Sequence, residues 1–185
     1  MLHVLDVAMN AVTAQAKTVK VSVRELPEQD RLCLLVADNG PGMAPDLVQA
    51  VLQHYATTKR KQTGWVGFGL ALLRGTVELC DGRFDLLSRP GVGTLVSAEM
   101  PYSHPDRPPL GQVAESLQTL LVGTRGVDFC LTHRVRDRSY RLDTRSVRRA
   151  MPDEYDTQTV RTWLVGQLRE GESALASGRQ GNDSG

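Results

Sequence analysis

Two glycine-rich turns on either side of a basic stretch constrain the fold of this chain more than any other feature. The first turn is Asp38-Asn39-Gly40-Pro41-Gly42-Met43, the basic stretch is Thr57-Thr58-Lys59-Arg60-Lys61, and the second turn is Gly67-Phe68-Gly69-Leu70. A segment carrying Asp6 and Asn10 precedes them. Each turn alone is common in many folds, but in this order and spacing they are the parts needed to hold an adenine nucleotide.

The first turn predicts an adenine-binding carboxylate. Asp38 follows the apolar run 32–37, so we expect its side chain at the end of a buried strand. There it can accept a hydrogen bond from an exocyclic amine, and a buried bond of this kind discriminates strongly. Gly40 and Gly42 lack a Cβ, so the backbone can turn sharply and approach the adenine ring. We expect Met43, which ends the turn, to contact the nucleotide as well.

The second turn and the basic stretch predict phosphate contacts. Gly67 and Gly69 lead into the apolar run 70–73, which would direct backbone N–H groups and a helix N-terminus at phosphates. We interpret residues 54–66 as a polar lid that is mobile until phosphates order it. The predicted contacts here are Thr58, Lys59, Val66, Gly67, Phe68, Gly69 and Leu70.

The first helix, expected over 2–16, adds polar groups to this site. An apolar stripe at helical spacing predicts that it packs on a sheet, and its members are Leu2, Leu5, Met9, Val12 and Ala16. Asp6 and Asn10 are four residues apart and therefore adjacent on a neighbouring face. We predict that Asn10 binds Mg²⁺, which prefers oxygen ligands, and that Asp6 orients a water for attack on the γ-phosphate. The alternative is that both are ordinary polar residues on a solvent face.

These segments together resemble the motifs of the GHKL ATPases, a superfamily of gyrase-type topoisomerases, heat-shock chaperones, sensor histidine kinases and mismatch-repair ATPases. Residues 6–11 resemble the N box, 38–42 the G1 box, and 57–70 the lid and G2 box. Gly93-Thr94 is similar to the family's Gly-Thr, whose threonine joins the adenine-binding aspartate through water. The resemblance spans residues 2–101. It implies a two-layer α/β sandwich, the Bergerat ATP-binding fold, with helices on one face of a mixed, mostly antiparallel sheet.

Two residues depart from the family pattern. The ATP-hydrolysing members have Glu four residues before the Asn, where this chain has Asp6. The shorter side chain holds the carboxylate further back, so we expect hydrolysis to be slow or absent. Trp65 stands where histidine kinases have the first glycine of their Gly-x-Gly-x-Gly, so the lid is only partly of that type.

We expect four segments along the chain. Residues 1–101 form the ATP-binding domain, 102–109 a proline-rich linker, 110–170 a small α+β extension, and 171–185 a disordered polar tail. In the first domain the patterns predict strands 18–25 and 31–37, helices 45–53 and 69–80, and a hairpin of 83–88 with 93–100. In the extension they predict helix 110–122, a hairpin of 127–131 with 140–142, and helices 143–150 and 157–169. Asp106-Arg107-Pro108-Pro109-Leu110-Gly111 resembles the extension of a group of short bacterial ATP-binding proteins, a likeness that implies no particular reaction.

Composition narrows the function classes. The chain has 185 residues, 41% apolar, which is enough for one core and a small second unit. A net charge of +1 argues against general attraction to nucleic acid or membrane. The three cysteines, Cys33, Cys80 and Cys130, are isolated in the sequence, which favours buried thiols in a reducing cytoplasm. No apolar run reaches about 18 residues, so we expect no membrane anchor. Seven arginines between 134 and 149 indicate a solvated face, or alternatively a nucleic-acid surface.

Two functions fit this sequence. The first is a Mg-ATP-binding, ATPase-like regulatory module that acts on a protein partner through the extension. The second is a protein kinase acting in trans on a serine or histidine, as anti-sigma factors and histidine kinases do. The kinase would act in trans because no helical hairpin bearing a phosphoacceptor histidine precedes Asp6.

Overall fold

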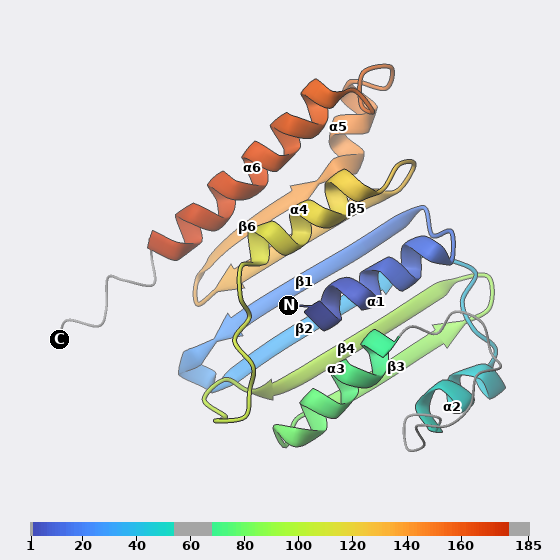
Figure 1. Ribbon diagram of the computed structural model, residues 1–185, viewed down its shortest axis with the longest axis vertical. Helices are drawn as coiled ribbons and strands as arrows, with labels where there is room; N and C mark the ends of the chain where they lie inside the picture. Colours follow the sequence, from blue (N-terminus) through green and yellow to red (C-terminus); the bar gives the residue numbers. More distant parts are fainter. Residues whose placement is uncertain (1, 54–67, 178–185) are drawn as a thin grey trace.

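The computed structural model of the protein describes residues 2–53 and 68–177. Its strands are β1 Thr18–Leu26, β2 Arg31–Asp38, β3 Arg83–Arg89, β4 Gly93–Pro101, β5 Asp128–Val135 and β6 Arg138–Asp143. Its α-helices are α1 Leu2–Thr13, α2 Pro45–Gln53, α3 Phe68–Leu79, α4 Val113–Gly123, α5 Thr144–Ala150 and α6 Gln158–Ser177, and a 3₁₀ turn covers Pro27–Gln29. The described strands form one sheet in the order β3-β4-β2-β1-β5-β6 (Figure 1). The predicted α/β sandwich is confirmed.

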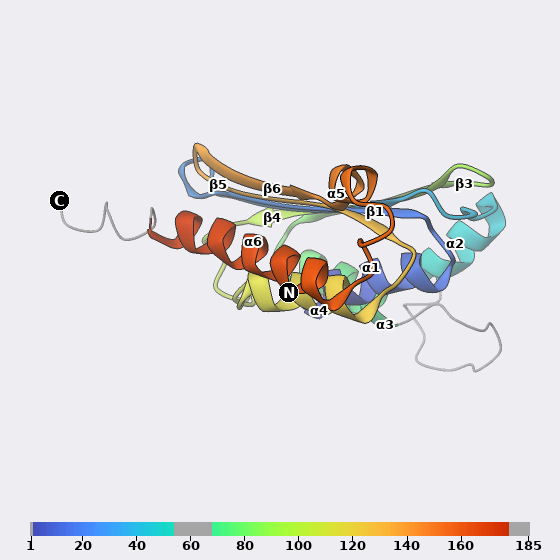
Figure 2. The same cartoon turned by 90° about the horizontal axis from the view of Figure 1, so that it is seen from above.

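Helices α1, α3, α4 and α6 cover one face of this sheet, which places the core between the two layers (Figure 2). The side chains of β1 show why the helices pack on this face of the sheet. Val19, Val21 and Val23 are almost fully buried, whereas the alternating Lys20 and Arg24 are exposed on the other face. Because successive side chains of a strand point to opposite faces, one apolar row is sufficient to seat the helical layer.

Helix α1 packs through a face that is shifted from the one predicted. Its buried side chains are Val4, Val7, Ala8 and Ala11, while Met9 is 39% exposed and lies outside the contact. Small side chains allow a helix to approach a sheet closely, so burial followed fit and not side-chain size. The predicted stripe was therefore wrong for Met9, whereas Leu5 and Val12 pack against the core and Ala16 is buried in it. The helix was predicted, but it ends at Thr13 and not at residue 16.

The extension continues the sheet of the first domain. Strand β5 pairs in parallel with β1, from Thr18 opposite Asp128 to Glu25 opposite Val135, and β6 pairs antiparallel with β5. The hairpin was predicted from the sequence, but its docking onto β1 was not. Residues 110–177 are consequently joined to the first domain by backbone hydrogen bonds as well as by side-chain packing.

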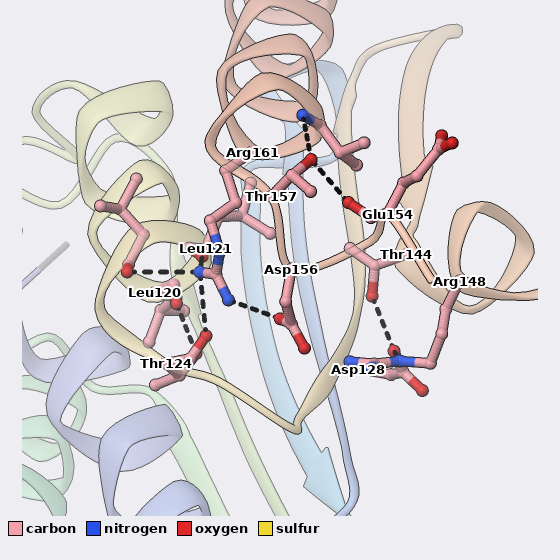
Figure 3. Close-up of polar contacts among 12 residues, drawn as sticks. Leu120, Leu121, Thr124, Asp128, Thr144, Arg148, Glu154, Asp156, Thr157 and Arg161 are labelled. Atoms are coloured by element: carbon pink, nitrogen blue, oxygen red, sulfur yellow. Dashed lines mark hydrogen bonds and ion pairs between the residues drawn. The ribbon is translucent and has the colours of Figure 1, made fainter. Parts of the chain in front are cut away.

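Arg161 of α6 ties the extension together at the end of α4 (Figure 3). Its guanidinium donates to the carbonyl oxygens of Leu121 at 3.0 Å and Thr124 at 3.2 Å, and to Asp156 at 2.8 Å. The last carbonyls of a helix lack partners within the helix, so a buried arginine that binds them replaces a C-terminal cap. Arg148 similarly bonds Asp128 at 2.8 Å and stacks on the ring of Tyr155.

Helix α6 is longer than the sequence patterns indicated. It continues to Ser177, so the prediction of a disordered tail from residue 171 was wrong for residues 171–177. Tertiary contacts hold this last part: Leu175 is buried, Glu172 bonds His133, and Gly171 lies against the ring of Tyr140. Residues 178–185 lie outside the described part of the chain.

Two further expectations concern the burial of the cysteines and the lack of a membrane-spanning helix. Cys80 and Cys130 are buried as predicted, but Cys33 is half-buried on the sheet face opposite α1, α3, α4 and α6. There burial and the nearby Glu99 raise the pKa of the Cys33 thiol. Among the helices that the structure describes, none combines the length and apolar character needed to cross a membrane.

Candidate functional site

A cavity of about 230 Å³ lies between the sheet, helices α1 and α2, and the start of α3. Its walls are mostly apolar, and its polar groups are few. Asn10, Asp38 and Thr94 supply those groups, from α1, β2 and β4 respectively. Of the predicted site residues, the cavity lining brings together Asn10, Asp38, Gly42, Met43, Leu70 and Thr94.

Asp38 lies at the end of β2, where its strand leaves the sheet. Burial raises the pKa of its carboxyl, and hydrogen bonds from the backbones of Gly40 and Thr94 partly offset that rise. The Gly40 N–H donates to Oδ1 over 2.7 Å, so the first turn orients the carboxylate. A half-buried carboxylate held in this way can accept a hydrogen bond from a ligand inside an apolar cavity.

Two glycines allow the loops around Asp38 to approach each other. Gly42 has φ of +66° and Gly93 has φ of +133°, conformations that residues with a Cβ rarely adopt. A Cβ on Gly42 would collide with the Arg89 carbonyl, and one on Gly93 with the Asp38 carbonyl. The turn after β2 and the β3–β4 hairpin therefore meet backbone to backbone beside the cavity.

Ser88 joins the same two loops, and sequence reasoning missed it. Its Oγ accepts the Met43 N–H at 2.8 Å, donates to the Gly93 carbonyl at 3.1 Å, and shares a hydrogen bond with the Thr94 hydroxyl at 2.9 Å. The register of the β3–β4 hairpin creates this contact by setting Ser88 opposite Thr94. No sequence signal marks it, because a serine near a turn is ordinary.

Asn39 is a second residue that sequence reasoning did not assign a role. Its Oδ1 accepts the backbone N–H groups of Lys17 and Thr18, at 2.9 and 2.7 Å. These bonds tie the turn after Asp38 to the start of β1. Asn and Asp frequently bond nearby backbone groups at turns, which is the signal that could have identified it.

Asn10 and Asp6 have different positions at the site. Asn10 lines the cavity, and its Nδ2 is buried without a hydrogen-bond partner among the described residues. Asp6, one helical turn earlier, is exposed and does not line the cavity. Its Cβ instead lies so close to Gly69 that a Cβ there would collide with it. Asp6 is thus adjacent to the N-terminus of α3, which begins at Phe68.

Several predicted positions are not part of the cavity as described. Gly40 does not line it but orients Asp38 from outside. Thr58, Lys59, Val66 and Gly67 lie outside the described residues, as does the rest of the predicted lid up to residue 67. The backbone of Phe68 is described and starts helix α3.

The apolar walls of the cavity were mostly not assigned from the sequence. They provide a surface that suits a flat aromatic ring, since ligand cavities are lined largely by apolar side chains with a few directing polar groups. Ala14 could have been recognised, because it follows Asn10 by four residues, about one helical turn. The unassigned lining residues are Val7, Ala11, Ala14, Val36, Pro41, Leu47, Val51 and Val96.

Comparison with known proteins agrees with this arrangement. The family model described as "Histidine kinase-, DNA gyrase B-, and HSP90-like ATPase" matches residues 1–104. Sensor histidine kinase ZraS of Klebsiella oxytoca is 36% identical over 101 residues, which is 54% of this chain and 21% of that protein. Sensor protein kinase CarS of Pseudomonas aeruginosa is 40% identical over 74 residues, 40% of this chain and 16% of that protein. This chain therefore covers about a fifth or less of the length of these two relatives.

Solved structures of histidine kinases are also similar in part. The histidine kinase domain of the blue-light activated kinase EL346 from Erythrobacter litoralis is 20% identical and aligns with 56% of this chain and 44% of that one, with a TM-score of 0.37. The kinase domain of the E. coli osmosensor EnvZ is 28% identical over 45% of this chain and 51% of that one, with a TM-score of 0.30.

The family match ends shortly after β4 and before α4. It covers more than half of the 185 residues and includes every described residue that lines the cavity. The chain therefore belongs to the family of histidine kinase-, DNA gyrase B- and HSP90-like ATPases, and its N-terminal part is an ATP-binding, ATPase-like module.

Proposed function

We propose that the protein binds Mg-ATP in the cavity between α1, α2 and the sheet and acts as a nucleotide-dependent regulatory module. The observation that carries this proposal is the position of Asp38, a half-buried carboxylate among apolar walls. It would accept the exocyclic amine of adenine, and Thr94 would join it through water. Phosphates would then extend past Asn10 toward the N-terminus of α3, where helix N–H groups favour anions. We place this activity in the cytoplasm.

Asn10 suits the magnesium ion that would accompany ATP. Its amide is at the cavity, and the buried unpartnered Nδ2 is a donor that would suit a phosphate oxygen, which leaves Oδ1 for the ion. Mg²⁺ is usually held by one or two protein oxygens, with phosphate oxygens and waters completing its shell. Asn10 Oδ1 would be the protein ligand, and the bound ion would offset negative charge on the phosphates. Within residues 2–53 and 68–177, no three His, Cys, Asp or Glu side chains are grouped to hold a metal by themselves.

Asp6 would orient the water that attacks the γ-phosphate. Its contact with Gly69 puts the carboxylate beside the start of α3, the place where we expect the phosphates. Aspartate reaches one methylene less far than the glutamate of the hydrolysing family members. We therefore propose slow hydrolysis, with the state of the bound nucleotide as the regulatory signal.

The second candidate function is phosphoryl transfer to a serine or histidine of a partner protein. It is favoured by the similar proteins, which are named sensor kinases and match 40% to 54% of this chain. The two candidates differ in the fate of the γ-phosphate. Incubation with γ-labelled ATP gives free labelled phosphate in the first case, and in the second it gives label on an added partner but little free phosphate.

Calorimetric titration with Mg-ATP tests the proposed binding. Asp38→Asn replaces an acceptor with an amide that can direct a donor at the same amine, so the affinity should fall at least about tenfold, or about 1.4 kcal/mol. Asp153→Asn removes the same charge from an exposed site in the extension and should bind like wild type. Equal affinities for wild type and Asp38→Asn would reject the assignment of Asp38.

The regulatory part of the proposal requires that the extension respond to nucleotide. Ordering of residues near Gly69 by phosphates can bias a partner only if the two states offer that partner different contacts. Hydrogen exchange with and without a Mg-ATP analogue should show slower exchange in 68–70 and also within 113–143. If exchange slowed only in residues before 102, the result would support ATP binding but reject coupling to the extension.

A further inference from the structure

The sheet face opposite α1, α3, α4 and α6 carries a basic surface that two distant parts of the chain build together. Helix α5 lies on the same side of the sheet, at one end of β5 (Figure 2). Because β5 pairs with β1, Arg24 stands directly opposite Arg134, and Ser22 directly opposite Thr132. Lys20 lies two residues before Ser22 on the same face, and Arg141 of β6 lies opposite Thr132. We call this set the basic face; its residues are Lys20, Ser22, Arg24, Thr132, Arg134 and Arg141.

Three of the four cations of the basic face lack an acidic partner among the described residues; the fourth, Arg141, lies 3.2 Å from Asp143. Among the described residues, neither Lys20 nor Arg24 makes an ion pair, and Arg134 bonds only a backbone oxygen, that of Arg136. The acids elsewhere on this side of the sheet already have partners. These pairs are Glu99 with Arg31, Asp85 with Arg83, and Asp143 with Arg145 and Arg141.

This arrangement costs stability and therefore suggests a binding role. Neighbouring strands are about 4.8 Å apart, and like charges directly opposite each other destabilise a sheet. Arg24 and Arg134 are exposed, so solvent reduces the repulsion but provides no partner. Their pairing exists only because the extension adds β5 to the first domain, and an anionic partner would relieve the repulsion.

An apolar area adjoins the basic face on the same side of the sheet. One row of residues crosses the sheet from β3 to β1, and neighbours in the row are paired. In order, the row is Leu87 on β3, Leu95 on β4, Ala37 on β2 and Lys20 on β1. Leu87 is 64% exposed, and Leu35 adjoins Ser22 on the next row. Apolar side chains and unpaired cations on one face of a sheet are typical of a surface for a partner that combines apolar and acidic side chains.

We propose that this side of the sheet docks an acidic amphipathic segment of a partner protein, with its carboxylates on Lys20, Arg24 and Arg134 and its apolar side chains on Leu35, Leu87 and Leu95. A protein is favoured over nucleic acid because the six strands place no aromatic residue on this face, and sheets that bind single strands stack bases on aromatic side chains. The proposal deepens the regulatory function above by naming the partner's chemistry. It leaves the ATP cavity, on the other side of the sheet, undisturbed.

The probe is a fluorescently labelled helical peptide with leucines on one face and glutamates on the other, and binding is followed by anisotropy. Wild type should bind it, more weakly as salt rises, and Arg24→Glu with Arg134→Glu should weaken binding at least about tenfold. Arg24→Lys with Arg134→Lys keeps the charge and should retain most of the affinity. Arg125→Glu with Arg169→Glu changes the net charge equally at exposed sites away from this face and should bind like wild type.

Further measurements compare a protein segment with nucleic acid and membrane as the bound partner, and test docking independently of ATP binding. Backbone amide shifts on adding the peptide should centre on Ser22, Thr132 and Leu35. A uridine oligonucleotide or phosphatidylserine vesicles that bind more tightly than the peptide, with the same arginine dependence, would overturn the proposal in favour of nucleic acid or membrane. Absence of peptide binding at low salt would also overturn it. Asp38→Asn should retain peptide binding, so loss of ATP binding and loss of docking are distinguishable.

Discussion

Gly69 of α3 lies against Asp6 of α1 so closely that no side chain fits between the two helices at this point. The contact is between residues 63 positions apart, and it places a carboxylate beside a helix N-terminus. It therefore determines both the packing of α1 on α3 and the position of the group that we propose for hydrolysis.

Gly69→Ala should destabilise the protein by about 1–3 kcal/mol, because the added methyl forces α1 and α3 apart. Gly75→Ala in the same helix is the matched control: a Cβ there meets nothing within 4 Å. That substitution should stabilise the protein by about 0.5–1 kcal/mol through improved helix propensity. Urea denaturation of both variants measures the difference, and equal effects would show that the Asp6 contact is not tight in solution.

Asn10→Ala should remove the dependence of ATP affinity on Mg²⁺, since it deletes the proposed protein ligand of the ion. Calorimetry with and without Mg²⁺ measures this.

Asp6→Ala should leave ATP affinity nearly unchanged and reduce turnover, because a group that orients water acts mainly on the chemical step. If Asp6→Ala released phosphate as fast as wild type, Asp6 would not be the group that orients the water.

His133 should make the protein less stable at alkaline pH. The ring is buried between two carboxylates, with Nδ1 2.8 Å from Glu172 and Nε2 2.9 Å from Glu25. Burial alone would lower its pKa, but the hydrogen bonds and charges of Glu172 and Glu25 outweigh burial and raise the pKa from 6.5 to about 9. Tyr102 donates to Glu25 at 3.1 Å, and burial together with Glu172 raises the pKa of the nearby Tyr140.

The sign follows from the raised pKa of His133. The folded state binds the proton more tightly than the unfolded state, so this stabilisation is fully present below pH 6.5 and is lost as the pH rises through about 9. Urea denaturation from pH 6 to 10 should show the free energy of unfolding falling across that window. His133→Gln should flatten the decline, whereas His104→Gln should leave it as in wild type.

Arg161→Ala should destabilise the extension by about 2–3 kcal/mol, because carbonyl groups at the end of α4 lose their buried donor. Arg169→Ala removes an exposed arginine of the same helix and should change stability by no more than about 0.5 kcal/mol. Hydrogen exchange should localise the Arg161→Ala effect to α4 and the start of α6. An effect spread evenly over the first domain would contradict this assignment.

Local features of the sequence predicted most of the elements. The alternation of Val19, Val21 and Val23 predicted β1 and its buried face, and the apolar run before Asp38 predicted the strand that ends at the cavity. The three helices of the extension were also predicted, α4 and α5 with ends within three residues, whereas α6 continues eight residues beyond its predicted end at 169. Periodicity and turn chemistry act within a few residues, which is why the printed sequence is sufficient for them.

Long-range contacts decided the remainder. The burial of Ala8 and Ala11 instead of Met9 depends on the surface that α1 meets, and the extension of α6 to Ser177 depends on His133 and Tyr140 from other strands. Ser88 joined the site only through the register of a hairpin.

The ATPase motifs can be recognised in the sequence alone, because a carboxylate at a strand end and glycines in turns are local features of the chain. The pairing of β5 with β1, which sets Arg24 beside Arg134, is found only in the folded protein. The physical reason is that strand pairing between residues about a hundred positions apart is selected by the packing of the whole helical layer, and no short segment encodes it.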